Sequence, residues 1–132
     1  MPLKVKGLDH LVLRVRDLAA MERFYVEALG LTVERRADQI GMVQLRAGAQ
    51  LVDLVAADGM LGRQGGAAPG AEGRNLDHFC LNLEDFDLAA VTAHLTAHGV
   101  QVGESGRRYG AGGFGVSLYL TDPEGNGLEL RG

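Results

Sequence analysis

The chain has 132 residues, 46% of them hydrophobic, and a formal net charge of -4, which is the size and composition of one globular domain. These values exclude a disordered chain and a protein that binds nucleic acid through its overall charge. No stretch approaches the ~20 apolar residues of a membrane span, and residues 1–6 lack the apolar run of a secretory signal, so we expect a cytoplasmic protein that binds neither membranes nor nucleic acid.

A single cysteine, Cys80, excludes an intrachain disulfide, so core packing, a partner subunit or a metal ion must stabilise the fold. Glycine is abundant, at 20 of 132 residues, and is concentrated in residues 57–75. That segment has no sustained hydrophobic period. It is therefore predicted to be a linker or mobile loop at mid-chain.

The two sides of this linker carry the same motif. Residues 8–13 read Leu-Asp-His-Leu-Val-Leu, and residues 76–81, which start 68 positions later, read Leu-Asp-His-Phe-Cys-Leu. We therefore predict a duplication within a single domain. Its parts are module 1 (residues 1–56), the glycine-rich linker (57–75) and module 2 (76–132), together covering residues 1–132.

Each motif is predicted to be a strand that is followed by a helix. Asp17 is positioned as the first N-cap and Gly30 as the end of that helix; in module 2, Asp85 or Asp87 caps and Gly99 ends the helix. The remaining strands are predicted at residues 31–35, 40–46, 50–55, 100–103, 115–121 and 127–131, with a loop at 104–114. Each module therefore has the order β-α-β-β-β, and the fold class is α+β.

Both histidines of the repeated motif are predicted to point away from the helices. Side chains alternate along a strand, so His10 shares a face with Arg14, while the opposite face is aliphatic and suited to pack on a helix. His78 repeats this arrangement together with Cys80 and Asn82. Two imidazoles are thus expected in the concavity that the strands enclose.

Two carboxylates fall at matching places later in each module. Asp53 lies among aliphatic residues of one predicted strand and Glu129 among leucines of another, 43 and 51 residues after the respective histidines. Burying unpaired carboxylates is costly, and a shared cation removes that cost. Two imidazoles and one or two carboxylates suit zinc, nickel, manganese, cobalt or iron(II), so we predict a divalent metal site.

At these residues the chain resembles the vicinal oxygen chelate superfamily, which includes glyoxalases, fosfomycin-resistance proteins, extradiol dioxygenases and bleomycin-binding proteins. The motifs that carry the resemblance are the two Leu-Asp-His triplets, the run Leu29-Gly30-Leu31, and residues 119–129, which read Tyr-Leu-Thr-Asp-Pro-Glu-Gly-Asn-Gly-Leu-Glu. The match spans essentially the whole chain, and small glyoxalase-domain proteins are the most similar members.

The resemblance implies paired βαβββ modules that form a U-shaped, eight-stranded mixed sheet around a cavity. It also implies a metal held by His10, His78 and Glu129, with Asp53 where glyoxalases often place a fourth ligand. Members of this size commonly dimerise with one site drawn from two chains, so a homodimer is expected.

The implied function is that of a metal-dependent lyase, isomerase or thiol transferase. The metal would act on a small oxygen-chelating substrate by stabilising an enediolate or alkoxide, a thiol such as glutathione could be a co-substrate, and Asp53 or Glu129 would serve as the base. The expected substrate-binding residues are Arg14, Asn82, Arg107, Arg108 and Tyr109. The alternatives are a non-catalytic drug-binding protein of the bleomycin-resistance kind and, disfavoured because residues 110–115 contain no histidine, an extradiol-type dioxygenase.

Overall fold

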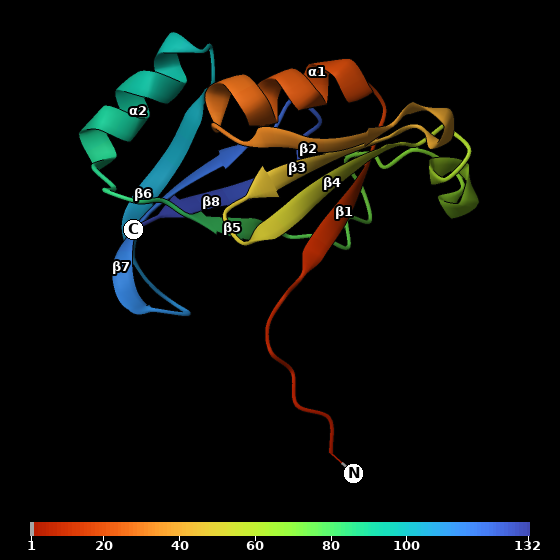
Figure 1. Ribbon diagram of the computed structural model, residues 1–132. Coiled ribbons are helices and arrows are strands. Elements are labelled where there is room, and N and C mark those ends of the chain that lie inside the picture. Colours follow the sequence, from red (N-terminus) through yellow and green to blue (C-terminus); the bar gives the residue numbers. More distant parts are fainter. Residues whose placement is uncertain (1) are drawn as a thin grey trace. The chain divides into compact units, whose positions relative to one another are not determined.

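The structure is a computed structural model that describes residues 2–132 (Figure 1). Its strands form two four-stranded mixed sheets, and the chain divides into two compact units. Unit 1 contains residues up to 18 together with 31–68, and unit 2 contains residues 19–30 and 69–132. The predicted α+β class and the eight strands are confirmed.

The sheet of unit 1 has the strand order β1-β4-β3-β2. Strand β1 pairs in parallel with β4, and the other neighbours are antiparallel. The elements are β1 (His10–Val15), β2 (Thr32–Ala37), the 3-10 turn η2 (Asp38–Ile40), β3 (Met42–Ala47), β4 (Gln50–Ala56) and the 3-10 turn η3 (Gly62–Gly65).

Unit 2 repeats this topology with the order β5-β8-β7-β6. Again the first strand of the unit pairs in parallel with the last, and the other pairs are antiparallel. Its elements are α1 (Leu18–Arg23), which enters the unit at Ala19, the π-helical turn η1 (Phe24–Ala28), β5 (Phe79–Asn82), α2 (Leu88–Ala97), β6 (Val102–Gly110), β7 (Gly113–Thr121) and β8 (Gly127–Arg131). The helix that follows the first motif in sequence thus belongs to the second compact unit.

The predicted helix boundaries are confirmed by local geometry. Of the two proposed caps for α2, Asp87 is the one used, because its side chain accepts a hydrogen bond from the Ala90 amide at 3.0 Å. Gly30 and Gly99 follow the two helices with φ angles of +79° and +74°. A left-handed residue at that place favours glycine, since a side chain would be strained there.

Alternation along the strands separates a buried face from a polar one, as predicted. On β1, Leu13 and Val15 are buried whereas His10 is exposed. In unit 2 the buried strand residues include Leu118, Leu120, Leu128 and Leu130, and Leu95 of α2 is buried with them. Each sheet therefore uses one face for the hydrophobic core and leaves the histidine-bearing face for polar groups.

The predicted loop at residues 104–114 is wrong. Strand β6 runs from Val102 to Gly110 and pairs with β7 through a tight turn at residues 111–112. The segment is rich in glycine and arginine and has no apolar alternation. It forms a strand because β7 supplies cross-strand partners along most of its length, a tertiary effect that overrides local propensity.

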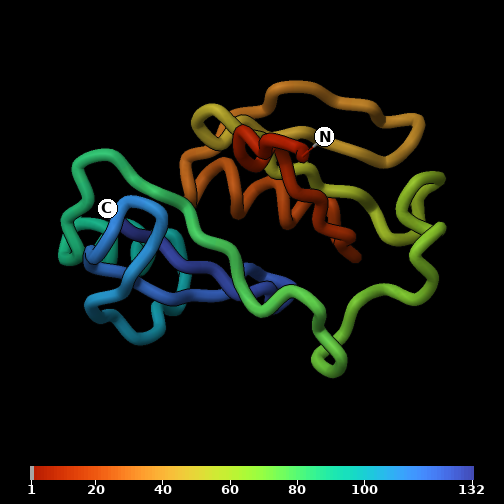
Figure 2. Tube along the Cα trace, turned by 90° about the horizontal axis from the view of Figure 1, so that it is seen from below, coloured from red at the N-terminus to blue at the C-terminus, as the bar shows by residue number. Residues whose placement is uncertain are grey.

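The predicted linker is built of turns. Residues 57–75 contain no strand, and their regular structure is η3. The winding course of this part of the chain can be followed in yellow-green to green in Figure 2. The first part of the segment, up to residue 68, belongs to unit 1 and the remainder to unit 2. None of the helices described for residues 2–132 has the length and apolarity of a membrane span.

Candidate metal-binding site

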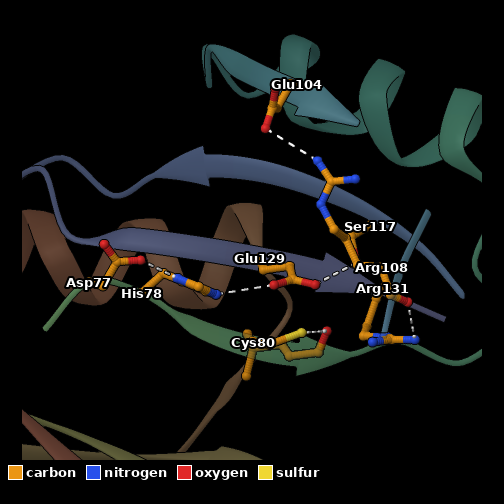
Figure 3. Close-up of polar contacts among 9 residues, drawn as sticks. Asp77, His78, Cys80, Glu104, Arg108, Ser117, Glu129 and Arg131 are labelled. Carbon is orange, nitrogen blue, oxygen red and sulfur yellow. Dashed lines mark hydrogen bonds and ion pairs between the residues drawn. The ribbon is translucent and has the colours of Figure 1, made fainter. Parts of the chain in front are cut away.

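Unit 2 brings two of the predicted ligands into contact. His78 directly precedes β5, and Glu129 lies on the neighbouring strand β8, so the parallel pairing places them side by side. Nε2 of His78 lies 3.2 Å from Oε1 of Glu129 (Figure 3). The side chain of Glu129 is 9% exposed and that of His78 is 38% exposed, so the pair has one buried and one accessible member.

The imidazole of His78 is oriented by the residue before it. Its Nδ1 lies 2.6 Å from the Asp77 carboxylate, as the row of dashed lines in Figure 3 shows. This hydrogen bond is the largest cause of the raised pKa of His78. Burial lowers the pKa, and the charges of Asp77 and Glu129 raise it further. Hydrogen bonding at Nδ1 leaves Nε2 to face Glu129, the arrangement that outer carboxylates impose on metal-binding histidines.

Both oxygens of Glu129 have partners. Burial by itself would raise the pKa of Glu129, but the hydrogen bond from Ser117, with help from Tyr119 and His78, lowers it. Ser117 is fully buried on β7, and its hydroxyl donates to Oε2 of Glu129. The carboxylate is therefore held as an anion in a fixed orientation.

Unit 1 repeats the histidine and its orienting carboxylate. Nδ1 of His10 lies 2.6 Å from the Asp9 carboxylate, and this bond is the largest cause that raises the pKa of His10. The charge of Asp53 raises it further. His10 is thus under the electrostatic influence of the second predicted ligand of its own unit.

Asp53 occupies in unit 1 the position that Glu129 occupies in unit 2. Glu129 is opposite Cys80, two residues after His78, and Asp53 is opposite Val12, two residues after His10. Asp53 is only 2% exposed; Gln44 donates to its Oδ2 at 3.1 Å, but its Oδ1 is buried without a hydrogen-bond partner. A buried carboxylate oxygen without a donor is what a bound cation would satisfy.

The donor set therefore fits a divalent cation, with one imidazole and one carboxylate in each unit. Among residues 2–132 the structure shows no group of three or more His, Cys, Asp or Glu side chains arranged to hold a metal. Each unit contains two residues of the predicted ligand set.

Arg14, one of the predicted substrate-binding residues, is engaged by its own unit. Its guanidinium donates to the carbonyls of Gly62, Gly66 and Ala67, at 2.8, 2.5 and 3.2 Å. Gly65 lies against the same group, because a Cβ there would be 2.6 Å from it. In this geometry Arg14 stabilises the conformation of the η3 segment through these hydrogen bonds.

The other predicted substrate residues divide between the two faces of the unit 2 sheet. Arg108 lies over the ring of Tyr119, with Cζ 5.6 Å from the centroid, and Tyr119 meets His78 edge-on with the centroids 5.8 Å apart. Arg107 instead lies over Phe114, which packs against Tyr109 on the opposite face. Asn82 is exposed and pairs in register with Arg131.

Cys80 is a neighbour of this site but not an activated thiol. Burial, followed by the charge of Glu129, raises the pKa of Cys80 to about 11. The thiol is therefore protonated at neutral pH and is a weak nucleophile.

The sequence analysis missed the residues that hold the carboxylates. Ser117 holds Glu129 and Gln44 holds Asp53, and each comes from the strand next to its partner. Only the cross-strand register reveals these pairs, whereas Asp9 and Asp77 are visible in the repeated Leu-Asp-His motif.

Comparison with known proteins agrees with the fold and the motifs. The family model of the Glyoxalase/Bleomycin resistance protein/Dioxygenase superfamily matches residues 7–130. The glyoxalase domain-containing protein RDO1 of Mycosarcoma maydis is 33% identical over 129 residues, which are 97% of this chain and 69% of that protein. Catechol-2,3-dioxygenase of Bacillus subtilis (strain 168) is 29% identical over 119 residues, but these cover 89% of this chain and only 38% of the dioxygenase.

A solved structure shares the architecture over its whole length. The integron cassette protein from the mobile metagenome of V. cholerae superimposes with a TM-score of 0.76 and 28% identity, covering 99% of this chain and 98% of that one. With two four-stranded sheets of the same topology, the doubled histidine motif and a family match over almost all of its length, the chain belongs to the Glyoxalase/Bleomycin resistance protein/Dioxygenase superfamily.

Proposed function

We propose that the protein is a metal-dependent enzyme of the glyoxalase kind, a lyase, isomerase or thiol transferase that acts on a small oxygen-chelating substrate. The observation that carries the proposal is the buried Asp53 oxygen without a donor, at the position equivalent to Glu129 of the His78–Glu129 pair. A structural carboxylate would be expected to have both oxygens satisfied.

The residues that would hold the ion are His10, His78 and Glu129, with Asp53 as a fourth ligand. A bound divalent cation would supply a Lewis acid that polarises substrate oxygens and stabilises the negative charge developing on them. Two imidazoles and two carboxylates suit zinc, nickel, manganese, cobalt or iron(II).

The chain itself supplies the groups that move a proton. Isomerisation next to a carbonyl needs a base within hydrogen-bond reach of the carbon acid, and Asp53 and Glu129 are the carboxylates of the set. Glu129 has both oxygens engaged by His78 and Ser117, whereas Asp53 Oδ1 is buried without a hydrogen-bond partner. Asp53 or Glu129 would therefore be the proton acceptor.

Among the proposed substrate residues, Arg108 is the best placed for a charged group. It lies on the face of the sheet that bears His78 and Glu129, and it forms an ion pair with the exposed Glu104, at 3.3 Å. A carboxylate or phosphonate on the substrate could replace Glu104 at the guanidinium. Asn82 on the same face would add an amide, whereas Arg14 would need to release the η3 segment to reach a substrate such as glutathione.

Metal analysis tests this proposal most directly. We expect the purified protein to bind a divalent ion stoichiometrically, and His10→Ala and His78→Ala each to weaken the binding. His98→Ala is the matched control, because His98 is the exposed residue that directly follows α2 and its ring donates to the His94 carbonyl. Absence of stoichiometric metal, together with unchanged affinity in His10→Ala, contradicts the proposal and favours a drug-binding protein.

Turnover would then be sought with hemithioacetals and with fosfomycin plus a thiol. We expect one class to react and the reaction to stop when the metal is removed by a chelator. Conversion that persists after chelation, or in His78→Ala, contradicts the metal-dependent mechanism.

A second candidate, ring-opening oxygenation, is raised by the similarity to catechol-2,3-dioxygenase, of which the match covers 38%. Two histidines and one carboxylate are also the ligand set of non-haem iron(II) oxygenases. Oxygen uptake by the iron(II)-loaded protein in the presence of catechol separates the two functions. We expect no uptake, because residues 110–115 offer no additional histidine.

A further inference from the structure

The two carboxylates at equivalent positions have different surroundings. Glu129 is bound at both oxygens, by His78 and by Ser117. Asp53 is bound at Oδ2 by the side-chain amide of Gln44, and its Oδ1 is buried and has no partner. The two modules therefore have a carboxylate at the same strand position, but the hydrogen-bond partners of Asp53 and Glu129 differ.

The register of the strands explains this difference. In unit 2, Ser117 is opposite Arg131, which lies two positions after Glu129 on β8. In unit 1 the residue two positions after Asp53 is Val55, and the residue opposite Val55 is Met42. Met42 is therefore the counterpart of Ser117. Methionine has no hydroxyl to donate. The donor to Asp53 is instead Gln44, which is directly opposite it and corresponds to Tyr119 of unit 2. Aspartate has one methylene fewer than glutamate. The shorter carboxylate of Asp53 is therefore reached by the long side chain of Gln44, the residue directly opposite it.

Gln44 is itself oriented by Arg35. The amide of a glutamine has a donor end and an acceptor end, and only the donor end can bind a carboxylate. Arg35, opposite Gln44 in the register, donates from Nη1 to Oε1 of Gln44 at 3.0 Å. This contact turns Nε2 of Gln44 toward Asp53. If the amide were reversed, its oxygen would face the carboxylate and repel it.

We propose that Gln44 and Arg35 are positioning residues, which hold Asp53 by Oδ2 and leave Oδ1, which has no protein donor, for the divalent cation. This inference rests on the proposed metal-dependent function. It adds that Asp53 is a ligand through one defined oxygen, and that the path Arg35–Gln44–Asp53 determines which oxygen that is. Outer partners of this kind typically affect metal affinity about 10- to 100-fold.

Calorimetric titration of the metal-free full chain with Zn²⁺ tests the proposal. We expect Gln44→Leu, which removes the amide at similar volume, to weaken Zn²⁺ binding by about 10-fold or more. Arg35→Met should weaken it less, because Gln44 keeps its donor but loses the group that orients it. Gln39→Leu, the same change at an exposed glutamine of unit 1, is the control and should bind like the wild type.

A double-variant comparison distinguishes positioning from a general structural effect. In an Asp53→Asn background, Gln44→Leu should cause no further loss of Zn²⁺ affinity, because the ligand that it positions is already removed. Equal affinity of Gln44→Leu and wild type, or additive losses in the double variant, overturns the inference. If the wild type binds no Zn²⁺, the proposed function fails and the inference fails with it, whereas wild-type binding that is insensitive to Gln44→Leu rejects the inference alone.

Discussion

Ser117 shows how one buried hydroxyl controls a carboxylate. Its side chain is fully buried and donates to Glu129, which is itself 6% exposed. Ser117→Ala would leave Oε2 of Glu129 without its donor, and we expect a loss of about 1–3 kcal/mol in the free energy of unfolding. Urea denaturation of the metal-free protein measures this loss.

Ser105→Ala is the control for that substitution, because Ser105 is exposed on the neighbouring strand β6. A surface serine should change the free energy of unfolding by less than about 0.5 kcal/mol. Equal stability of the two variants would mean that the Ser117 hydroxyl does not stabilise the Glu129 anion.

The ligand candidates could be predicted from the sequence, but their partners could not. His10 and His78 are identified by a repeated triplet, and Asp53 and Glu129 by their unusual place among aliphatic residues. Gln44 has no such signal, because its role depends on which residue of β4 it is opposite. Register is a tertiary property and is not contained in the composition of either strand.

At the scale of elements, one hydrogen bond ties the η1 turn to the loop between β7 and β8. The Tyr25 hydroxyl donates to the Asp122 carboxylate at 2.7 Å, and Tyr25 is fully buried. Burial, followed by the charge of Asp122, raises the pKa of Tyr25 above its usual value, so the phenol remains a donor. We expect Tyr25→Phe to lower the free energy of unfolding by about 1–3 kcal/mol, measured by thermal or urea denaturation.

Tyr109→Phe provides the comparison for that variant. Tyr109 is 74% exposed, so loss of its hydroxyl should leave stability nearly unchanged. A Tyr25→Phe variant as stable as Tyr109→Phe contradicts a role for the hydroxyl in joining helix to loop.

The η3 segment depends on Arg14 in a similar way. Three carbonyls of residues 62–67 accept from its guanidinium, and no strand ladder holds these residues in place. Arg14→Met should therefore loosen the segment and speed tryptic cleavage after Arg63, because proteolysis follows local opening. Cleavage after Arg74 is the internal reference in the same digest, since Arg74 donates to the Glu124 carbonyl in unit 2. A constant ratio of the two cleavage rates contradicts the role of Arg14.

Strand prediction succeeded where apolar residues alternate and failed where they do not. The last strand was predicted at residues 127–131, its observed bounds, because leucines and polar residues alternate there. Strand β6 has the sequence Val-Gly-Glu-Ser-Gly-Arg-Arg-Tyr-Gly, with no periodic apolar face. Its pairing with β7 supplies what the local sequence lacks.

At the scale of the whole molecule, the duplication is visible in the sequence but the division into compact units is not. The first helix follows the first Leu-Asp-His motif, yet it packs with unit 2, where Tyr25 stacks on Phe79 and Ala28 accepts from His94. A helix with one apolar stripe can pack on either of two similar sheets. The sequence pattern alone does not choose between them.

The exposed segment before β1 bears on the expected homodimer. Leu3 and Val5 are each 87% exposed, although both are apolar. In an extended chain Leu3 and Val5 share one side and Lys4 and Lys6 the other, which is the pattern of a strand with one face to bury. We expect a second copy of the chain to cover this apolar side.

Size-exclusion chromatography with light scattering, which measures the molar mass of the protein, tests this expectation. The wild type should have twice the chain mass of 14.0 kDa, and Leu3→Glu combined with Val5→Glu should shift the population to the monomer, because charges are costly in an apolar interface. Lys4→Gln combined with Lys6→Gln alters the opposite side and should leave the dimer intact. A monomeric wild type, or dimers in both double variants, contradicts the assignment of this segment to the interface.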